Sequence, residues 1–397
     1  MDGRPRRQLA AIRGFLFVLG LYCHIPFCSA ICNYCNFNRG LFDPALKERY
    51  VDALIDEIRA GGSAPDGRSW LGRPADTVYF GGGTPSLLEP HEIGRIIQAC
   101  TASFALSPDA EITLEANPES ASLDRLAGFR SVGVNRVSFG VQSFRDSELV
   151  RLSRLHTAGR AAEAFAEARA AGFDNVSLDL MMWLPGQSPE DWLQSVEAAI
   201  GLQPDHASLY MLEVYPNSPL RDEMARRRWS QAPDEDVAEM YDAAMTRFEA
   251  AALVQYEISN VARHGRRSRH NLKYWTDGEW FGFGCGAHST AGGWRWKNIA
   301  GTEDYVARIR SGQSPSMDAR RLSSDERLGD AMFTGLRLNE GVDLAEISAR
   351  YDVDVWERFG GELTPFVNEG LLCHEGSRIS LTRRGMLLAH EVMAVFV

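Results

Sequence analysis

Residues 22–37 read YCHIPFCSAICNYCNF and place three cysteines, Cys28, Cys32 and Cys35, in one short loop. The loop follows an apolar run, residues 15–22, which predicts a buried strand. Thiolates at this tight C-x3-C-x2-C spacing are typical ligands of an iron–sulfur cluster. They can hold three corners of a [4Fe–4S] cube, which leaves the fourth iron open to another ligand.

A zinc ion and a disulfide are the alternatives for these cysteines. Structural zinc takes four tetrahedral ligands, and His24 or Cys23 would supply the fourth. Structural zinc motifs usually bring a second ligand pair from farther along the chain, and the sequence shows no such pair. A disulfide is disfavoured because the chain has seven cysteines, an odd number, and three of them crowd one loop. We therefore favour the cluster.

The chain has 397 residues, of which 45% are hydrophobic, and its formal net charge is −11. A chain of this length can bury one large core and a smaller one. The negative charge argues against nucleic acid as a main partner, since phosphate binding needs a basic surface. Residues 1–14 are basic and irregular and predict a loose N-terminal extension. No secretory cleavage site or membrane-length apolar run is evident, so we expect a cytoplasmic protein.

Strand and helix patterns alternate between residues 15 and 255. Strands are expected at 15–22, 76–80, 111–115, 136–141, 176–182 and 207–214, and helices at 44–58, 90–104, 123–132, 160–171 and 190–200. Repeated strand–helix units of this length imply a parallel sheet with helices packed outside it. The sequence therefore predicts an α/β fold, a partial (β/α)6 barrel similar to a TIM barrel, over residues 15–255.

Polar or glycine-rich segments lie at or near the carboxyl end of each predicted strand. In order along the chain they are the cysteine loop, Gly81–Gly83, Glu115, Gln142, Asp179 and Glu213. Any one of these could be a satisfied polar group. Six on one rim are hard to explain as packing, because the carboxyl ends of barrel strands line active sites. The glycine run lacks the lysine of a phosphate loop, but its backbone amides are expected to be open to a ligand.

Two further regions follow the predicted barrel. A connecting region at residues 256–300 contains the segment HNLKYW at 270–275 and a glycine-rich turn at 282–288. Residues 301–397 are expected to form a C-terminal domain with three helices, a hairpin at 371–381 and a last helix from Thr382. That order resembles a winged-helix module, and without a basic face it predicts scaffolding or docking rather than DNA binding.

Several motifs together resemble the radical S-adenosylmethionine (SAM) superfamily. The cysteine loop and the segment GGGTP at 81–85 carry the general resemblance. The segments GVNRVSFGVQSF at 133–144 and LPGQ at 184–187, with YCHIPFC at 22–28, resemble the oxygen-independent coproporphyrinogen III oxidase group. The resemblance covers almost all of the chain after residue 16, including the C-terminal module.

This resemblance implies a set of ligands and a chemistry. Cys28, Cys32 and Cys35 would hold the cluster, whose open iron would chelate the amine and carboxylate of SAM. The residues that match the SAM contacts of the family are Tyr22, Tyr34, Gly82, Gly83, Thr84, Glu115, Gln142, Arg154 and Asp179. Reduction of the cluster, by a donor such as flavodoxin or ferredoxin, would cleave SAM to a 5′-deoxyadenosyl radical. Glu115 and Asp179 would thus belong to the catalytic site with the cysteines.

Within this group the sequence resembles the haem chaperone branch more than the decarboxylases. Decarboxylases carry a fourth cysteine two residues after the third, where this chain has Phe37, and a longer N-terminal segment. The chaperone branch has Cys-x-Phe and a His-Asn-x-x-Tyr-Trp motif, matched by residues 270–275. The resemblance implies a protein that binds haem and delivers it to acceptor haemoproteins such as membrane-bound respiratory enzymes, and it allows a homodimer. Coproporphyrinogen decarboxylation, or haem sensing without SAM turnover, are the alternatives.

The haem ligand and the cavity shape remain open at this point. His270 could be an axial ligand of haem, with Tyr274 and Trp275 stacked on the porphyrin. Alternatively, His270 and Trp275 pin the connecting region to the barrel and contact no haem. The chaperone group usually has an Ile-Tyr-Gly-like step where this chain has Met181, Met182 and Trp183, so a bulky indole is expected to alter the cavity. Cys23 is expected to be a buried apolar position.

Overall fold

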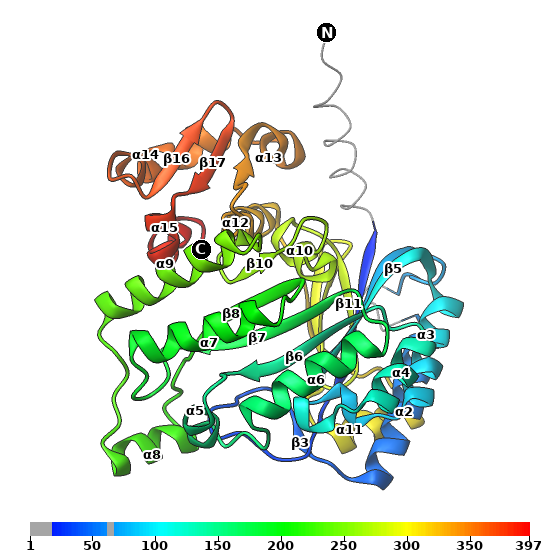
Figure 1. Ribbon diagram of the computed structural model, residues 1–397. Helices are drawn as coiled ribbons and strands as arrows, with labels where there is room; N and C mark the ends of the chain where they lie inside the picture. Colours follow the sequence, from blue (N-terminus) through cyan, green and yellow to red (C-terminus); the bar gives the residue numbers. More distant parts are fainter. Residues whose placement is uncertain (1–17, 62–66) are drawn as a thin grey trace.

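The computed structural model describes residues 18–61 and 67–397, and its centre is a single twelve-stranded sheet (Figure 1). Six neighbouring strands run parallel and form the predicted partial barrel. They are β1 (Leu19–Ile25), β4 (Pro74–Gly82), β5 (Ala105–Ala116), β6 (Arg136–Gln142), β7 (Val176–Met182) and β8 (His206–Met211). The sheet ends in β14 (Ser316–Arg321) on one side and β9 (Val254–Glu257) on the other, so the barrel stays open.

The helices between these strands cover the outer face of the sheet (Figure 1). They are α2 (Pro44–Arg59), α3 (Pro90–Ser103), α4 (Leu123–Ser131), α6 (Ala158–Ala170) and α7 (Pro189–Gly201). Side chains cap the helix starts: Asp43, Ser122, Thr157 and Ser188 each accept a hydrogen bond from a first-turn amide. The predicted alternation is confirmed, and β7 has the predicted bounds. The predicted extension 1–14 and the first part of the predicted strand 15–22 lie outside the described residues.

The sheet continues beyond β1 by strands that sequence patterns did not reveal. β11 (Trp280–Phe283) pairs parallel with β1, and β12 (His288–Ala291), β13 (Trp294–Asn298) and β14 (Ser316–Arg321) follow in antiparallel order. The turn expected at 282–288 is therefore shorter, because Gly282 belongs to β11. A Cβ at Gly282 would lie 2.3 Å from the carbonyl oxygen of His288, so the close strand pairing requires glycine there.

The other edge of the sheet ends in a small hairpin. It is formed by β9 (Val254–Glu257) and β10 (Asn260–Ala262), which are joined by a turn at residues 258–259, and β10 pairs antiparallel with β8. Three helices complete this half of the chain: α5 (Asp146–Arg151), α8 (Pro219–Arg227) and α9 (Asp234–Ala250). Strand β8 ends at Met211, earlier than the predicted residue 214.

The C-terminal module has its own core, made of side chains between Leu328 and Phe396. Its helices are α12 (Ser324–Gly335), α13 (Leu344–Tyr351), α14 (Val355–Asn368), α15 (Arg383–Leu387) and α16 (Ala389–Met393). The hairpin is β16 (Leu372–Glu375) with β17 (Arg378–Leu381), and β15 (Val342–Asp343) adds a third strand. By contrast, Tyr305 and Val306 of α11 (Thr302–Arg310) are buried in the core of the sheet.

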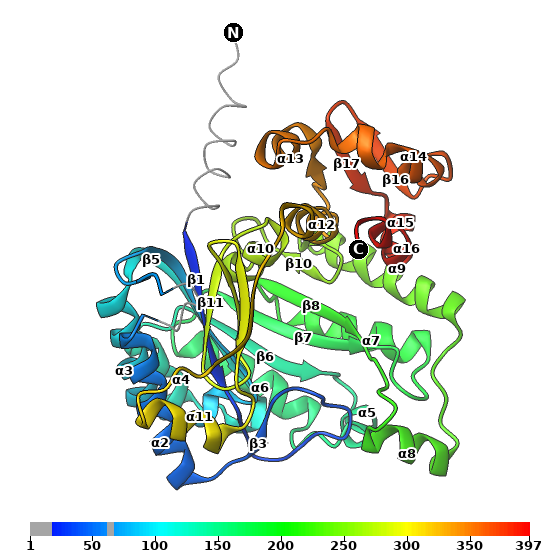
Figure 2. The same ribbon diagram turned by 180° about the vertical axis from the view of Figure 1, so that it is seen from behind.

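The module and α10 (Arg269–Trp275) lie at the end of the sheet where β1 begins, whereas the cysteine loop lies at the end where β1 finishes (Figure 2). Lys273 of α10 fixes this placement, because its ammonium donates to the Val18 carbonyl at 2.8 Å and pairs with Asp76 at 2.6 Å. Within the described ranges no helix is both long and apolar enough to cross a membrane.

Candidate functional site

The glycine-rich end of β4 holds the cysteine loop in place. The Gly83 amide donates to the Ile25 carbonyl at 2.8 Å, and the Thr84 amide donates to the Phe27 carbonyl at 2.7 Å. A Cβ at Gly83 would lie 2.6 Å from that Phe27 oxygen, so only glycine allows this approach. These amides were expected to be open to a ligand. Instead they support the loop, and the Gly82 amide donates to Glu115.

The far end of the loop is held by residues from the other half of the chain. The Asn38 side-chain amide donates to the carbonyls of Cys285 and Ala300, each at 3.1 Å. His24 donates from Nε2 to the Asn38 carbonyl at 2.7 Å, and its Nδ1 accepts from the Tyr22 hydroxyl at 3.1 Å. The Tyr22 side chain was expected to contact SAM. It is placed to support the loop instead, and it does not line the cavity described next.

A cavity of about 490 Å³ opens between the cysteine loop and the carboxyl ends of the parallel strands. Its lining includes the following predicted residues: Cys28, Cys32, Cys35, Tyr34, Gly82, Gly83, Thr84, Glu115, Gln142, Arg154 and Asp179. The size suits one small ligand or nucleoside cofactor. Six elements distant in the sequence thus converge on one site, as the strand-end pattern predicts.

The donor set at the inner end of this cavity fits a thiolate-bound cluster. The three loop cysteines are partly exposed and carry no disulfide. The Thr84 hydroxyl lies 3.7 Å from the Cys28 sulfur, and a guanidinium nitrogen of Arg154 lies 3.7 Å from the Cys32 sulfur. Both contacts stabilise thiolate charge. Among the described residues no three His, Cys, Asp or Glu side chains lie close enough to bind one metal ion such as zinc. A four-iron cube does not need them that close, because each thiolate binds a different iron.

Two buried carboxyl groups face the same cavity. The Tyr79 hydroxyl donates to Glu115 Oε1 at 2.7 Å, and the Ser138 hydroxyl donates to Asp179 Oδ1 at 3.2 Å. Burial raises the pKa of Glu115 to about 7 and that of Asp179 to about 6. Both groups therefore change charge near neutral pH, and a cationic ligand would hold them ionised.

Arg154 connects the strand ends around the cavity. It donates to the Asn117 side-chain oxygen at 2.7 Å and to the Gly140 carbonyl at 2.6 Å, and the Asn117 amide donates to Thr84 at 3.0 Å. Gln142 adopts a left-handed backbone with φ of 69°, a strained conformation that is common at functional sites. Asn117 is a site residue that the sequence did not single out. Its position directly after β5, beside Glu115, is the signal that could have found it.

Comparison with known proteins places the chain in a family. The radical SAM superfamily profile matches residues 22–199, and the HemN C-terminal domain profile matches residues 322–388. "Heme chaperone HemW" of Bacillus subtilis is 36% identical over 95% of this chain and 98% of its own length. HemW of Mycobacterium tuberculosis is 38% identical over 94% of this chain and 93% of its own. This chain belongs to the HemW family of radical SAM proteins.

Membership of this family agrees with the fold and with the donor set. The radical SAM superfamily implies a [4Fe–4S] cluster and SAM, and the three loop cysteines are placed to hold such a cluster. Coproporphyrinogen III oxidase (HemN) from Escherichia coli has the same overall fold, with a TM-score of 0.82 over 98% of this chain and 93% of the other. At 24% identity that likeness concerns the fold alone.

This HemW-family chain accommodates Trp183 without filling the cavity. Trp183 follows β7 and adopts a left-handed backbone with φ of 65°, the conformation that glycine adopts most easily. Its indole turns away from the site, packs against the main core and donates to the Ala232 carbonyl at 2.8 Å. The expectation that the indole would alter the cavity is therefore wrong, and Met181 is the residue of this segment that lines it.

His270 lies beside Gly20 at the start of β1, whereas the cysteines follow the end of that strand. Its side chain is only 1% exposed, and its two ring nitrogens bond the hydroxyls of Thr77 at 2.8 Å and Tyr274 at 2.9 Å. Burial lowers its pKa to about 3, so the ring is neutral. With both nitrogens engaged and the side chain buried, the position supports the alternative interpretation, in which His270 pins α10 to the barrel.

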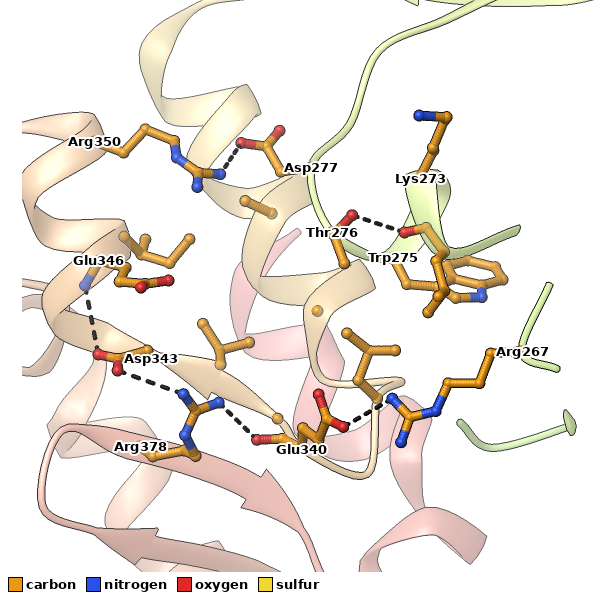
Figure 3. Close-up of a pocket in the computed structure, with 17 residues that line it drawn as sticks. Arg267, Lys273, Trp275, Thr276, Asp277, Glu340, Asp343, Glu346, Arg350 and Arg378 are labelled. Atoms are coloured by element: carbon orange, nitrogen blue, oxygen red, sulfur yellow. Dashed lines mark hydrogen bonds and ion pairs between the residues drawn. The ribbon is translucent and has the colours of Figure 1, made fainter. Parts of the chain in front are cut away.

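A second cavity, of about 290 Å³, lies between α10 and the C-terminal module (Figure 3). Its rim carries ion pairs that join the two parts: Arg267 with Glu340 at 2.8 Å, and Arg350 with Asp277 at 2.8 Å. Trp275 lines the wall. None of the residues predicted to bind the cluster or SAM lies in this cavity.

Proposed function

We propose that this protein is a haem chaperone that holds a [4Fe–4S] cluster and SAM, binds haem and delivers it to acceptor haemoproteins. The observation that carries the proposal is Phe37. It stands where decarboxylases of the group carry a fourth cysteine, and its side chain lines the cluster cavity. The names of the HemW relatives, which are similar over nearly the whole chain, agree with this assignment.

In this proposal each group of cavity residues has a separate task. Cys28, Cys32 and Cys35 hold the cluster, which supplies the electron that cleaves SAM when both are bound. Glu115 and Asp179 ionise against the cationic ligand, and Gln142 contributes its side-chain amide. Arg154, held between Asn117 and Gly140, keeps positive charge beside the thiolates. Tyr34 closes the apolar side of the cavity against Leu212 and Leu220.

The wider setting is also part of the proposal. We place the protein in the cytoplasm, where free thiols persist, with flavodoxin or ferredoxin as electron donor. The acceptors would be haemoproteins, membrane-bound respiratory enzymes among them, and a homodimer is the expected assembly. The C-terminal module would serve as a docking unit.

The test begins with anaerobic reconstitution of the cluster in the full chain. SAM, a reductant and coproporphyrinogen III are added, and both porphyrin products and 5′-deoxyadenosine are followed by chromatography. We expect cleavage of SAM without protoporphyrinogen formation. In a separate titration of the same protein with haem, we expect a saturable haem absorbance band. Protoporphyrinogen formed over many turnovers would overturn the chaperone assignment in favour of a decarboxylase. Haem binding with no SAM cleavage would favour the sensing alternative.

A further inference from the structure

The lining of the cavity beside the cysteine loop combines two kinds of side chain. The thiols, Glu115 and Asp179 are described above. Four large apolar or aromatic side chains also line the cavity and are nevertheless partly exposed: Phe37 by 65%, Tyr210 by 43%, Met211 by 48% and Tyr215 by 38%. We call these four residues the outer rim. Exposed apolar side chains gathered around a polar cavity indicate a ligand or partner surface.

The outer rim is rigidly supported. Phe37 directly precedes Asn38, whose side chain is bonded to Cys285 and Ala300, so the backbone at Phe37 is fixed. Tyr210 and Met211 end β8 and pair with Met181 and Met182 of β7. The Tyr215 hydroxyl donates to Glu213 at 2.7 Å. The backbone that carries these side chains is therefore anchored at the end of β8 and beside the Asn38 tether.

The chemistry of the outer rim and its neighbours suits a large flat macrocycle with carboxylate arms. Aromatic rings present planar apolar faces, and the thioethers of Met211 and Met181 are soft groups of the kind that ligate haem iron. Arg39 supplies positive charge on the same wall. Its guanidinium donates to the Cys35 carbonyl, and within the described part of the chain no carboxylate is paired with it, so it can pair with a propionate.

Size decides where such a ligand lies. The whole cavity has room for one nucleoside-sized ligand, so SAM bound beside Glu115 and Asp179 would take up most of it. A tetrapyrrole must then lie across the mouth, in contact with the outer rim. Two other locations for haem are less suitable. The first is His270, which is buried and has both ring nitrogens bonded. The second is the cavity of Figure 3, which is smaller and whose rim arginines are paired to carboxylates or carbonyls.

We infer that haem binds across the mouth of the cluster cavity, with its plane on the outer rim and a propionate at Arg39. This location rests on the proposed function and adds to it a cargo site next to SAM. It also gives Phe37 a role, since a cysteine at that position would offer the macrocycle a much smaller contact.

The experiment is a haem titration of the cluster-loaded protein, followed by absorbance. Its variants are Phe37→Ala and Tyr215→Ala, singly and together, and Met211→Ala. We expect each aromatic replacement to raise the haem Kd about five- to tenfold and the pair about fiftyfold, with the SAM Kd unchanged. Val150→Ala is the matched control, because Val150 is exposed and apolar but lies outside the cavity, and its haem Kd should equal that of the wild type.

The outcomes distinguish an error in the location of the haem site from an error in the proposed chaperone function. If the wild type binds haem and the double variant binds it equally well, the location is overturned while the chaperone function stands. A large loss of haem affinity in His270→Ala, with the iron content and the SAM Kd equal to those of the wild type, would likewise overturn it. Variants that keep haem affinity but no longer deliver haem would show that the outer rim contacts the acceptor protein instead. If the wild type binds no haem, the proposed function itself fails, and the location with it.

Discussion

The hydroxyl of Tyr79 lies 2.7 Å from Oε1 of Glu115, while the ring of Tyr79 stacks on His270 with centroids 5.1 Å apart. A residue in the middle of β4 thus connects helix α10 at one end of the barrel with a carboxylate of the cluster cavity at the other. Because His270 is itself bonded to Thr77 and Tyr274, the Tyr79 ring has little freedom to move. The carboxylate is held in place through this column of side chains.

Replacing Tyr79 should therefore weaken SAM binding. Tyr79→Phe keeps the ring but removes the hydroxyl, so we expect the SAM Kd to rise about tenfold. The lost hydrogen bond stabilised the ionised form of Glu115, so its pKa should rise and the pH midpoint of binding should move upward. Equilibrium dialysis at several pH values measures both effects. Tyr351→Phe, which removes a hydroxyl bonded to Asp277 far from the cavity, should change neither.

SAM binding by the wild type should depend on pH near neutrality. The pKa of Glu115 is about 7 and that of Asp179 about 6, and both groups must be ionised to hold a cationic ligand. Below these values protons compete with SAM, so affinity should fall by up to about tenfold per pH unit for each group. Calorimetric titration between pH 5 and 8 would check this. An affinity that stays constant over that range would contradict the assigned ligand roles.

The same shifts should make the unliganded protein less stable as the pH rises. The ordinary pKa values are 4.5 for Glu115 and 3.8 for Asp179, so between these and the raised values the folded protein binds protons that the unfolded chain has released. This stabilisation is fully present below about pH 4 and is lost as the pH rises through 7. Urea unfolding at pH 5 and pH 8 measures it. Glu115→Gln, which is neutral at every pH, should lose less stability between the two conditions.

Replacing Trp183 should show whether the packing of its indole outweighs the strain of its left-handed backbone in the free energy of unfolding. Trp183→Gly would relieve about 1–2 kcal/mol of left-handed strain but would lose about 3–5 kcal/mol of packing. We expect a net loss of about 2 kcal/mol in the free energy of unfolding, measured by urea denaturation. Gln203 is the matched control, because it is exposed and also left-handed, with φ of 56°. Gln203→Gly should not destabilise the protein.

Gly83 should be required for cluster loading. In Gly83→Ala the added Cβ would lie 2.6 Å from the Phe27 carbonyl, so the cysteine loop must shift. We expect the iron content after reconstitution to drop by more than half, while the circular dichroism of the rest of the fold persists. Gly40→Ala is the control, because a Cβ at Gly40, on the strand that pairs with the start of the loop, meets no atom within 4 Å. Equal iron content in the two variants would argue against the supporting role of Gly83.

The parallel half of the fold could be predicted from sequence, and the reason is local. Each strand from β4 to β7 contains a short apolar run with a helix pattern behind it, and the capping residues mark where those helices begin. Strand β5 begins at Ala105, before the predicted residue 111, because its first residues are polar and give no apolar signal. The cysteine loop was found in the same way, because its ligands are close together in the chain. Local patterns report local structure well.

The parts that could not be predicted depend on contacts between distant segments. Strand β11 is short and contains Gly282, so nothing in its own sequence indicates that it pairs with β1. The direction of the Trp183 indole depends on Ala232, and the burial of His270 depends on Thr77. No local pattern encodes such partners.

The tether at Asn38 has a consequence for how the protein is made. The carbonyl of Ala300, which holds the end of the cysteine loop, lies 262 residues later in the chain, and β1 gains its second neighbour only when β11 has been synthesised. While the ribosome is still translating the barrel, the loop that carries Cys28, Cys32 and Cys35 is therefore incompletely anchored. We therefore expect cluster loading to follow synthesis of most of the chain rather than to nucleate its folding.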